Sequence, residues 1–585
     1  MASQESDATS EQIRESVGDL FSDLLDSYQR MNMPMRRYVL MILLPSIGFL
    51  VLTVVVALLL DDLAFMIRAP IPLLGLLALG TAIFYPKVLL SQERKALNNR
   101  LHLLITHMTV LSTTRIDRME VFRALSKEDE YGALTIEMRR IVQLVDTWNQ
   151  SLDDALRRRA KQVPSEALSD VFDRLAYTLG AGQSLKEFLI SEQEQVMQNY
   201  ETVYSGALDN IDVMKDLYMS MILSMTFALV FAVVLPVLTG TDPTMTVAAV
   251  IAMFVFVQTG FYIAIRAMAP YDPLWYNPEG ITTDLDKWMI ATFATGVALT
   301  MFLSVISIGG FFGVSPISLE MLLPLSPVPL PLYVAIPITP LIIPGIYMRR
   351  AENRIKAKDE EFPSFIRALG AAEGAKQATS SMVLQSLRKK DFGELTGDID
   401  DLYKRLNMRI EPTSAWRYFT ADCRSYLIQK FSEMYLIGRE MGGSPKQLGE
   451  IIATNMNVVM QLRQKRSQAT TTLIGLLYGI SAASTFAFFI GLQVVNILAN
   501  MTLDINSTGQ FDVGSLINTQ VYNIPLIEFL LIIVIVFNAL LSSLMIRETD
   551  GGHKMNSYMH FVLITWLGSI ISIVTKNMVS SFLSI

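Results

Sequence analysis

The residue types that perform most enzyme chemistry are sparse in this chain of 585 residues. Its one cysteine, Cys423, cannot form an internal disulfide, and no cysteine and histidine spacing resembles a metal site. His102 and His107 are five positions apart and do not share a helix face, and His553 and His560 lie far away in the sequence. The chain has no Gly-Lys dipeptide, which excludes a phosphate-binding P-loop, and it has neither a nucleophile elbow nor an HExxH motif. We therefore predict no enzymatic activity, no cofactor and no bound metal, so that any ATP is used by a partner.

Two clusters of basic residues are the first candidates for binding another molecule. They are Arg157, Arg158 and Arg159, and Arg388, Lys389 and Lys390, and we expect all six to be exposed. Such a cluster can be a solvated face, or it can attract anionic lipid headgroups. It can also steer an acidic surface of a protein partner, because charge chiefly sets encounter rate and orientation. Both alternatives stay open, and no nucleic-acid partner is predicted.

The elements that position these residues are largely apolar. Hydrophobic residues make up 51% of the chain, charged residues 18%, and the mean hydropathy is +0.38, which is typical of a polytopic membrane protein. A bilayer core needs about 20 apolar residues per helix. Nine stretches meet this need: residues 38–60, 69–86, 217–238, 246–266, 288–312, 328–347, 471–499, 523–546 and 558–575. The sixth contains five prolines, which we expect to kink or break it.

Basic residues predict the orientation of these stretches, because short cytoplasmic flanks collect lysine and arginine. Arg36 and Arg37 precede the first stretch, whereas the connections at 239–245, 313–327 and 500–522 contain neither residue type. The N-terminus and both long polar blocks are therefore predicted to be cytoplasmic. An odd number of helices then places the C-terminus outside.

The two polar blocks are related by a tandem duplication. Residues 131–135 (YGALT) and 392–396 (FGELT) match at an offset of 261 residues. Gly182 matches Gly443 at the same offset. A repeat of this length means that both blocks share one fold.

Each polar block is expected to be an all-α bundle. Apolar residues recur at helical spacing, and period-two alternation is absent. Each bundle ends in a glycine turn followed by a serine that can cap the next helix. The turn residues are Gly180, Gly182 and Ser184 in the first block, and Glu440, Gly442, Gly443 and Ser444 in the second. The helix after the second turn is expected to enter the membrane without a break, either to transmit a mechanical push or as an ordinary connection.

The predicted fold class is an all-α polytopic membrane protein with about nine transmembrane helices and two homologous cytoplasmic helical-bundle domains. The N-terminus carries no secretory signal, and apolar spacing over residues 11–31 predicts an amphipathic helix. The predicted organisation is a cytoplasmic N-terminal helix in 1–37, a transmembrane pair in 38–86, the first bundle in 87–216, four transmembrane helices in 217–347, the second bundle in 348–470 and three transmembrane helices in 471–585.

Two helical cytoplasmic domains that each end in a glycine turn and precede membrane helices resemble the duplicated domain of the type II secretion F family. These proteins are platforms of secretion systems, type IV pili and archaeal flagella. The helix pair ahead of each domain departs from the bacterial layout and is similar to that of archaellum platform proteins. The resemblance covers the two polar blocks, and its motifs are specific mainly because they occur in tandem.

The resemblance implies a platform in the cytoplasmic membrane that contacts a cytoplasmic hexameric ATPase and helps to insert archaellin or pilin subunits into a filament. It also implies contact with membrane lipids and a homo-oligomer such as a dimer. The two basic clusters are then candidates for ATPase docking. Glu528, about six residues inside the eighth stretch, is either a near-interface helix contact or a subunit contact.

Two alternatives to the archaellum platform remain. An adhesion-pilus or secretion platform shares the same domain pair. A secondary transporter can also be built from parallel repeats, but nearly all the predicted spans lack charged residues in their middle thirds, which disfavours an ion-coupled carrier.

Overall fold

The structure is a computed structural model. It describes residue 28 and residues 34–59, 70–278, 280–311, 319–322, 328–376, 380–508 and 523–583. The chain divides into two compact units, Met1–Val196 and Met197–Ile585. Across the described residues the regular elements are helices, and the only bridge between extended segments joins Trp275 and Ser425, which confirms the all-α prediction. The amphipathic helix predicted over 11–31 lies outside the described residues apart from Tyr28.

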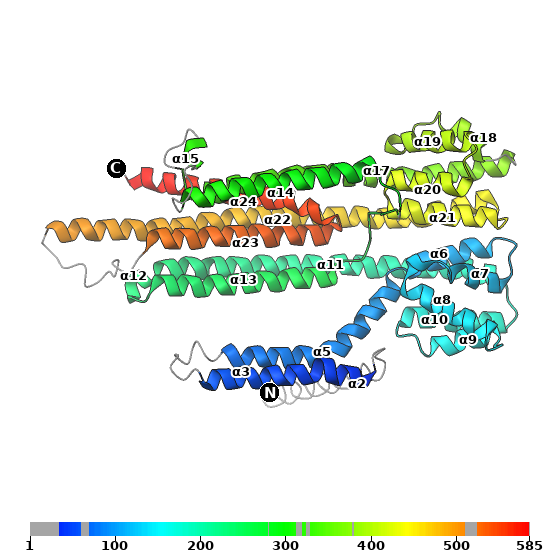
Figure 1. Cartoon of the computed structure of the whole chain (residues 1–585), viewed down its shortest axis with the longest axis horizontal. Coiled ribbons are helices and arrows are strands. Elements are labelled where there is room, and N and C mark those ends of the chain that lie inside the picture. The colour runs from blue at the N-terminus through cyan, green and yellow to red at the C-terminus, as the bar shows by residue number, and fades with distance from the viewer. Residues whose placement is uncertain are drawn as a thin grey trace, which may run out of the picture. The chain divides into compact units, whose positions relative to one another are not determined.

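Unit 1 begins with an apolar helical hairpin. Its first arm comprises α2 (Met35–Tyr38), the π-helical η1 (Val39–Leu43) and α3 (Leu44–Leu59), and its second arm is α5 (Pro70–Asn98). Figure 1 shows the two arms side by side. Gly75 allows their close approach, because a Cβ atom there would lie 2.2 Å from Thr53 Oγ1. The Tyr38 hydroxyl donates to the Ala82 carbonyl at 2.8 Å and fixes the other end of the pair.

The first bundle follows the hairpin within unit 1. Its helices are α6 (Leu101–Ser112), α7 (Arg118–Leu125), α8 (Ala133–Asp146), α9 (Leu152–Ala160), α10 (Glu166–Gly180) and the start of α11 (Leu185–Val234), with the short η2 (Asp129–Tyr131) before α8. Ser151 and Ser165 cap α9 and α10 through their side chains. The core is formed by apolar side chains such as Leu104, Phe122 and Leu134, all without exposed surface.

The second bundle repeats this helix order within unit 2. Its helices are the polar half of α17 (Ile342–Lys376), α18 (Ser380–Leu387), α19 (Thr396–Asn407), α20 (Pro412–Cys423), α21 (Tyr426–Glu440) and the start of α22 (Pro445–Thr508), with η4 (Gly393–Leu395) before α19. Gly132 and Gly393 both have positive φ angles, of 60° and 53°, at the equivalent turn. The duplication and the offset of 261 residues are confirmed at this position.

The offset is 260 residues at the glycine turns. Gly182 and Gly442 have φ angles of 75° and 84°, and the residue after each donates back into the preceding helix, from Gln183 N to Thr178 O at 3.1 Å and from Gly443 N to Gly438 O at 2.8 Å. Gly182 is therefore equivalent to Gly442, and the predicted pairing with Gly443 was wrong by one residue. The physical reason is that the second bundle is one residue shorter between Gly393 and Arg409, because the offset is already 260 at Asn149 and Arg409, the left-handed residues after α8 and α19. It stays 260 at Ser165 and Ser425, which cap α10 and α21.

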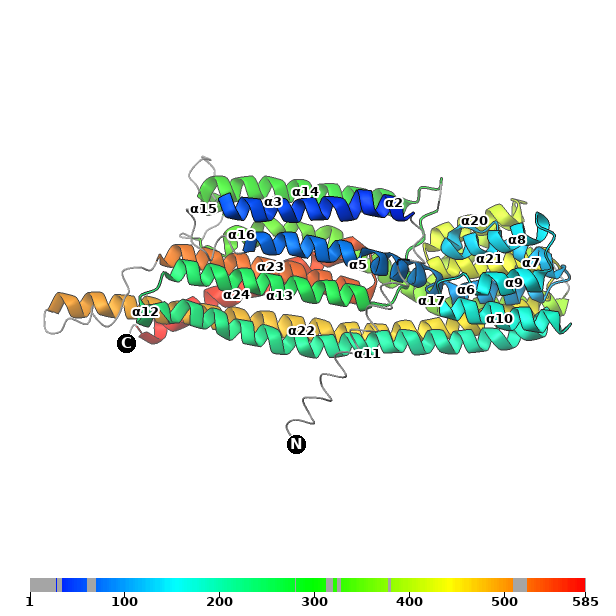
Figure 2. The same cartoon turned by 90° about the horizontal axis from the view of Figure 1, so that it is seen from below.

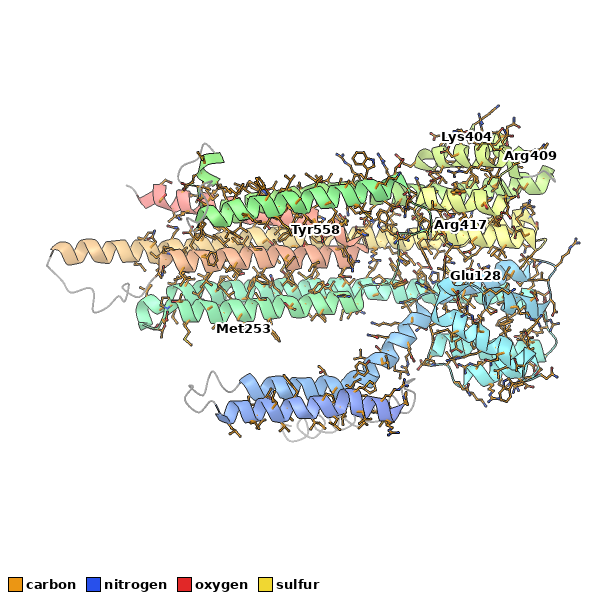
Figure 3. The ribbon with its side chains drawn as sticks, in the orientation of Figure 1. Glu128, Met253, Lys404, Arg409, Arg417 and Tyr558 are labelled. Atoms are coloured by element: carbon orange, nitrogen blue, oxygen red, sulfur yellow. The ribbon has the colours of Figure 1, made fainter. Side chains whose placement is uncertain are left out.

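Unit 2 contains most of the apolar helices of the chain. They are α11, α12 (Pro236–Thr239), α13 (Pro243–Met268), α14 (Asp284–Phe311), α15 (Leu319–Leu322), α16 (Leu332–Ile338), η3 (Thr339–Leu341), α17, α22, α23 (Ile524–Asp550), η6 (Lys554–Asn556) and α24 (Ser557–Leu583). Buried residues such as Leu229, Phe254, Phe488 and Leu531 join α11, α13, α22 and α23. Figure 2 shows α13 and α23 side by side within this unit. Outward positions stay apolar, as at Met253, which is 53% exposed and points away from α23 (Figure 3).

The predicted membrane stretches are mainly helical where the structure describes them, and the sixth becomes helical only from Leu332. Eight helices in the described residues are long and apolar enough to cross a membrane: Met35–Val55, Leu185–Val234, Pro243–Met268, Asp284–Phe311, Leu332–Ala375, Pro445–Leu498, Ile524–Asp550 and Lys554–Ser581. The predicted second stretch coincides with α5, which is not one of the eight. The proline-rich sixth stretch tightens into the 3-10 turn η3 and then continues as α17.

Candidate functional site at the base of the second bundle

The described part of the connection between α13 and α14, residues 269–278 and 280–283, forms a strap across the second bundle. Pro270, Pro273 and Pro278 keep this segment from forming a helix. Its backbone pairs with the turn between α20 and α21, from Tyr426 N to Leu274 O at 3.1 Å and from Tyr276 N to Arg424 O at 2.9 Å. The strap therefore ties two apolar helices to the bundle.

Arg463 on α22 clamps the strap to α17. Its guanidinium donates two 2.7 Å bonds to the Asp272 carboxylate of the strap and one 2.6 Å bond to Asp359 of α17. The Arg463 side chain is 10% exposed, and the side chains of Asp272 and Asp359 are 6% and 0% exposed. The hydroxyl of Ser425, which caps α21, also donates to Asp359. One arginine thus connects α22, α17, the strap and α21 through bidentate geometry that lysine cannot reproduce.

Arg424 makes a second buried connection at the start of α14. Its side chain is 4% exposed and donates to the Thr283 hydroxyl at 2.7 Å and to the Asp286 carboxylate. Arg424 also has a positive φ angle of 59°, a conformation that costs energy in a residue with a side chain. The contacts with Thr283 and Asp286 hold this conformation in place.

The turn between α23 and α24 is held by two carboxylates. Glu352 of α17 is fully buried and accepts bonds from the His553 backbone N–H and, at 2.8 Å, from Asn556. Asp550 accepts from Arg349 at 2.9 Å and from Lys356 at 3.1 Å. These contacts complete a set of ion pairs and hydrogen bonds that joins the strap, α17, α22 and the α23–α24 turn, which we call the junction.

Glycine is required in this turn. Gly551 has a φ angle of 75°, and a Cβ atom there would lie 2.6 Å from the Arg466 guanidinium. Arg466 donates to the Thr549 carbonyl at 2.5 Å and the Glu548 carbonyl at 3.0 Å. These bonds fasten α22 to the end of α23.

A polar cavity of about 530 Å³ opens beside the junction. Its lining includes Asp272, Lys356, Glu360, Arg463, Arg466 and Asp550. In the part of the chain that the structure describes, no three histidine, cysteine, aspartate or glutamate side chains converge to hold a metal.

The predicted basic clusters are only partly exposed. Arg157 and Arg158 are exposed, but Arg159 is buried and pairs with Glu137 at 2.6 Å, so its predicted exposure was wrong. It turns inward because α9 packs that face on α8. Arg388, Lys389 and Lys390 are all exposed, and Arg388 pairs with Asp400 at 3.5 Å.

Both clusters lie at the end of their bundle where the polypeptide enters from the apolar helices. In unit 1, the cluster residue Arg159 pairs with Glu137, which is in the first turns of α8. Gly132, which precedes α8, lies beside Arg100, just after α5. In unit 2, Gly393 follows the second cluster and lies beside Glu361, next to the junction. The glycine turns are at the opposite ends.

The turn residues occupy the positions that the sequence predicts. Ser184 and Ser444 immediately precede α11 and α22, and their carbonyls accept from Phe188 N at 3.2 Å and Leu448 N at 2.9 Å. Gly180 and Glu440 are the last residues of α10 and α21. Gly443 is required for space, because a Cβ atom there would lie 2.7 Å from the Gly438 carbonyl oxygen.

Glu528 forms a contact between two membrane helices. Its side chain is 11% exposed, and both carboxylate oxygens lie 3.1 Å from Lys576 Nζ of α24. This is the helix contact that the sequence allowed. A role in binding a filament subunit stays a prediction.

A buried polar network lies among the apolar helices and was missed from the sequence. Gln258 of α13 donates to Asn538 of α23 at 2.6 Å, and Asn538 donates to Ser481 of α22 at 2.8 Å. Thr226 and Ser484 add a 2.8 Å bond between α11 and α22. Charge alone within the spans does not reveal this network, because neutral polar residues also join membrane helices.

Comparison with known proteins places the chain in a family. The family model "Type II secretion system (T2SS), protein F" matches residues 104–235. The "Flagella accessory protein J" of Methanocaldococcus jannaschii is 35% identical over 573 residues, which covers 96% of this chain and 98% of that protein. This chain belongs to the flagella accessory protein J family. The protein of the same name from Methanococcus voltae is 34% identical over 568 residues, covering 96% and 99%.

Membership of the flagella accessory protein J family agrees with the membrane architecture, and the chain is a multi-pass membrane protein with a type II secretion F domain. The family-model match extends from α6 to the end of the apolar part of α11. The junction lies outside that match but inside the region shared with the full-length relatives. No solved structure matches the chain.

Proposed function

We propose that this protein is the membrane platform on which the archaellum, a type IV pilus-like filament, is assembled. In this proposal both bundles and the N-terminus face the cytoplasm, in keeping with the arginine and lysine flanks of the spans. A cytoplasmic hexameric ATPase supplies the energy, and archaellin subunits enter the filament beside the apolar helices. The chain itself hydrolyses no nucleotide, since its sequence has no P-loop.

The observation that carries this proposal is the continuity of α22. This single helix of 64 residues begins at the glycine turn of the second bundle and ends beyond the apolar region. Between Pro445 and Arg463 it covers about 27 Å, at 1.5 Å per residue. A force applied at the turn would reach the membrane part through one rigid element, because an unbroken helix has no hinge.

The junction determines which helices move with α22. Arg463 and Arg466 fasten it to the strap, to α17 and to the end of α23. The strap in turn joins the ends of α13 and α14. We propose that a displacement of the second bundle moves these helices together and so makes room for, or pushes on, a subunit helix.

The test is complementation of a strain that lacks this protein. The wild-type gene should restore archaellum filaments and swimming, and a tagged copy should co-purify the secretion ATPase from detergent extracts. Recovery of surface attachment without swimming would instead assign the protein to an adhesion pilus. Solute uptake by reconstituted vesicles, without any filament, would contradict the platform proposal.

A further inference from the structure

A second, smaller cavity in unit 2 carries more positive than negative charge. It has a volume of about 270 Å³ and lies between α17, the start of α14 and the turn between α20 and α21. Its charged lining residues are Arg350, Arg354, Lys358, Arg424 and Asp422. Four cationic side chains therefore meet one carboxylate in this cavity, which we call the basic pocket.

Three of these five charged side chains are already neutralised by a partner. Lys358 pairs with Asp398 at 2.7 Å, and Asp422 pairs with Arg405 at 2.6 Å. Arg424 pairs with a carboxylate in the first turn of α14. These pairs leave only the two remaining arginines to attract a ligand.

Arg350 and Arg354 are the two remaining cations. Both side chains are exposed, and neither forms an ion pair with any residue that the structure describes. They are four positions apart on α17, a spacing that places both side chains on one face of the helix. The Cys423 thiol beside them stays neutral, because burial raises its pKa. The basic pocket therefore presents two positive charges without counter-charge on one wall.

The basic pocket lies where the helices of unit 2 change from apolar to polar. Arg350 follows an apolar run over residues 332–348, and Leu285 lies just before the apolar part of α14. The two helices pack closely beyond this level, since a Cβ atom on Gly296 would lie 3.0 Å from Pro344. In a membrane-spanning protein, this boundary between apolar and polar surface coincides with the lipid headgroups.

Two aromatic residues support this depth. Tyr347 lines the basic pocket, one turn before the arginines. Trp288, one turn beyond Leu285 on α14, is 62% exposed. Tyrosine and tryptophan are enriched at the level of the headgroups, where one part of the ring system is apolar and the other is polar. The pocket thus opens at the depth where phospholipids carry their phosphate.

We propose that the basic pocket binds the headgroup phosphate of a membrane phospholipid through Arg350 and Arg354. Guanidinium groups match phosphate oxygens through paired N–H bonds, and basic pockets between membrane helices bind phospholipid headgroups. The acyl chains would follow the outward face of α14, where Met301 and Val305 are exposed. The bound lipid would connect α14, α17 and the turn between α20 and α21. This inference requires the membrane architecture and not the proposed function.

The pocket would recognise the phosphate and not the net charge of the headgroup. Phosphatidylcholine and phosphatidylglycerol both carry a phosphodiester, so both should bind, whereas a glycolipid without phosphate should not. The two basic clusters differ in this respect, because attraction to a membrane surface depends on its net negative charge. Inorganic phosphate has the same oxygens but no acyl chains, so it should bind much more weakly.

The test is native mass spectrometry of the full-length, delipidated protein in detergent, titrated with phosphatidylglycerol. R350Q/R354Q should bind the lipid about tenfold more weakly than the wild type, because charge-assisted hydrogen bonds are lost. R266Q/K554Q is the matched control, since Arg266 and Lys554 are exposed at the ends of membrane helices but do not line the pocket. This control should bind as the wild type does, and unchanged elution profiles would show that both variants are folded.

Four results would overturn the inference. The first is equal lipid affinity in R350Q/R354Q and the wild type. The second is an equal loss in R266Q/K554Q, which would show that surface charge in general holds the lipid. Equal binding of the glycolipid would show that the acyl chains suffice, and displacement of the lipid by inorganic phosphate would assign the pocket to a soluble phosphate compound. Each result leaves the proposed function intact, because lipid binding is measured on the purified protein.

Discussion

Arg463 is the single residue on which the junction depends most. It satisfies two buried carboxylates at once, so that its loss leaves both Asp272 and Asp359 without their main counter-charge. Removing one partner of a buried ion pair costs about 3–5 kcal/mol. We expect R463Q to lower the thermal midpoint of the detergent-solubilised protein by several degrees.

The control for R463Q is an arginine in an exposed pair. Arg367 pairs with Glu450 at 3.0 Å, but the two side chains are 43% and 60% exposed. Such a pair contributes about 0–1 kcal/mol. R367Q should therefore leave the midpoint nearly unchanged, and equal effects of R367Q and R463Q would show that the junction is not a special connection.

His553 makes the α23–α24 turn sensitive to acid. Burial lowers the pKa of His553, and the nearby charges of Arg547 and Lys554 lower it further. Its neutral Nδ1 accepts from the Met555 backbone N–H at 3.3 Å, and Glu352 accepts from its own backbone N–H. The pKa of His553 in the folded state lies below the unfolded value of about 6.5. The stabilisation of the folded protein by neutral His553 is therefore present above that pH and is lost as the pH falls.

The variant that tests this pH dependence is H553N, because asparagine can cap a helix and does not titrate between pH 5.5 and pH 7.5. The wild-type thermal midpoint should fall between pH 7.5 and pH 5.5 by more than that of H553N. The measurement is a melting curve at each pH in the same detergent. Equal falls of the thermal midpoint in the wild type and H553N would show that His553 is not the source of the pH dependence.

At the scale of elements, paired glycines set the contact of α17 with α22. A Cβ atom on Gly370 would lie 2.3 Å from the Pro445 carbonyl oxygen, and one on Gly449 would lie 2.8 Å from the Ile366 carbonyl oxygen. Backbone cannot move aside as a flexible side chain can. G370A should cost about 1–3 kcal/mol by forcing the helices apart.

The matched change is G397A, within α19. A Cβ atom on Gly397 meets nothing within 4 Å, so alanine there should stabilise the helix by about 0.5–1 kcal/mol. Both variants can be compared by urea or thermal unfolding of the purified protein. Destabilisation of similar size in both would mean that close backbone approach is not what selects glycine at position 370.

The helical elements could be predicted from the sequence because apolar periodicity and glycine turns act locally. The stretch at 471–499 and the Gly442 turn lie where the pattern places them. The junction could not be predicted, because Asp272, Asp359 and Arg463 are separated by many residues and meet only through packing. Nothing in a single sequence distinguishes an arginine that flanks a span from one, such as Arg463, that forms buried ion pairs. The burial of Arg159 was missed for the same reason.

For the whole molecule, the position of the basic clusters favours lipid headgroups over the ATPase as their partner. Both clusters lie at the bundle ends next to the apolar helices. Each cation near an anionic surface contributes about 1 kcal/mol. The wild-type protein should therefore melt at a higher temperature in anionic nanodiscs than in zwitterionic ones, and a variant with Arg157, Arg158, Arg388, Lys389 and Lys390 all changed to glutamate should lose this difference. A normal lipid response with weakened ATPase binding would support the steering alternative instead.

The central claim is that α22 transmits force as one rigid helix from the second bundle to the membrane. Thr454 and Gln461 are exposed positions on α22 between the glycine turn and Arg463. Glycine at an exposed helix position costs about 1 kcal/mol relative to alanine and permits bending. The decisive measurement is the number of filaments per cell in the deletion strain complemented with T454G/Q461G or with T454A/Q461A, at equal protein levels in the membrane. We predict that the alanine variant assembles filaments as the wild type does and that the glycine variant binds the ATPase but assembles few or none. Equal filament numbers in the two strains would contradict the claim.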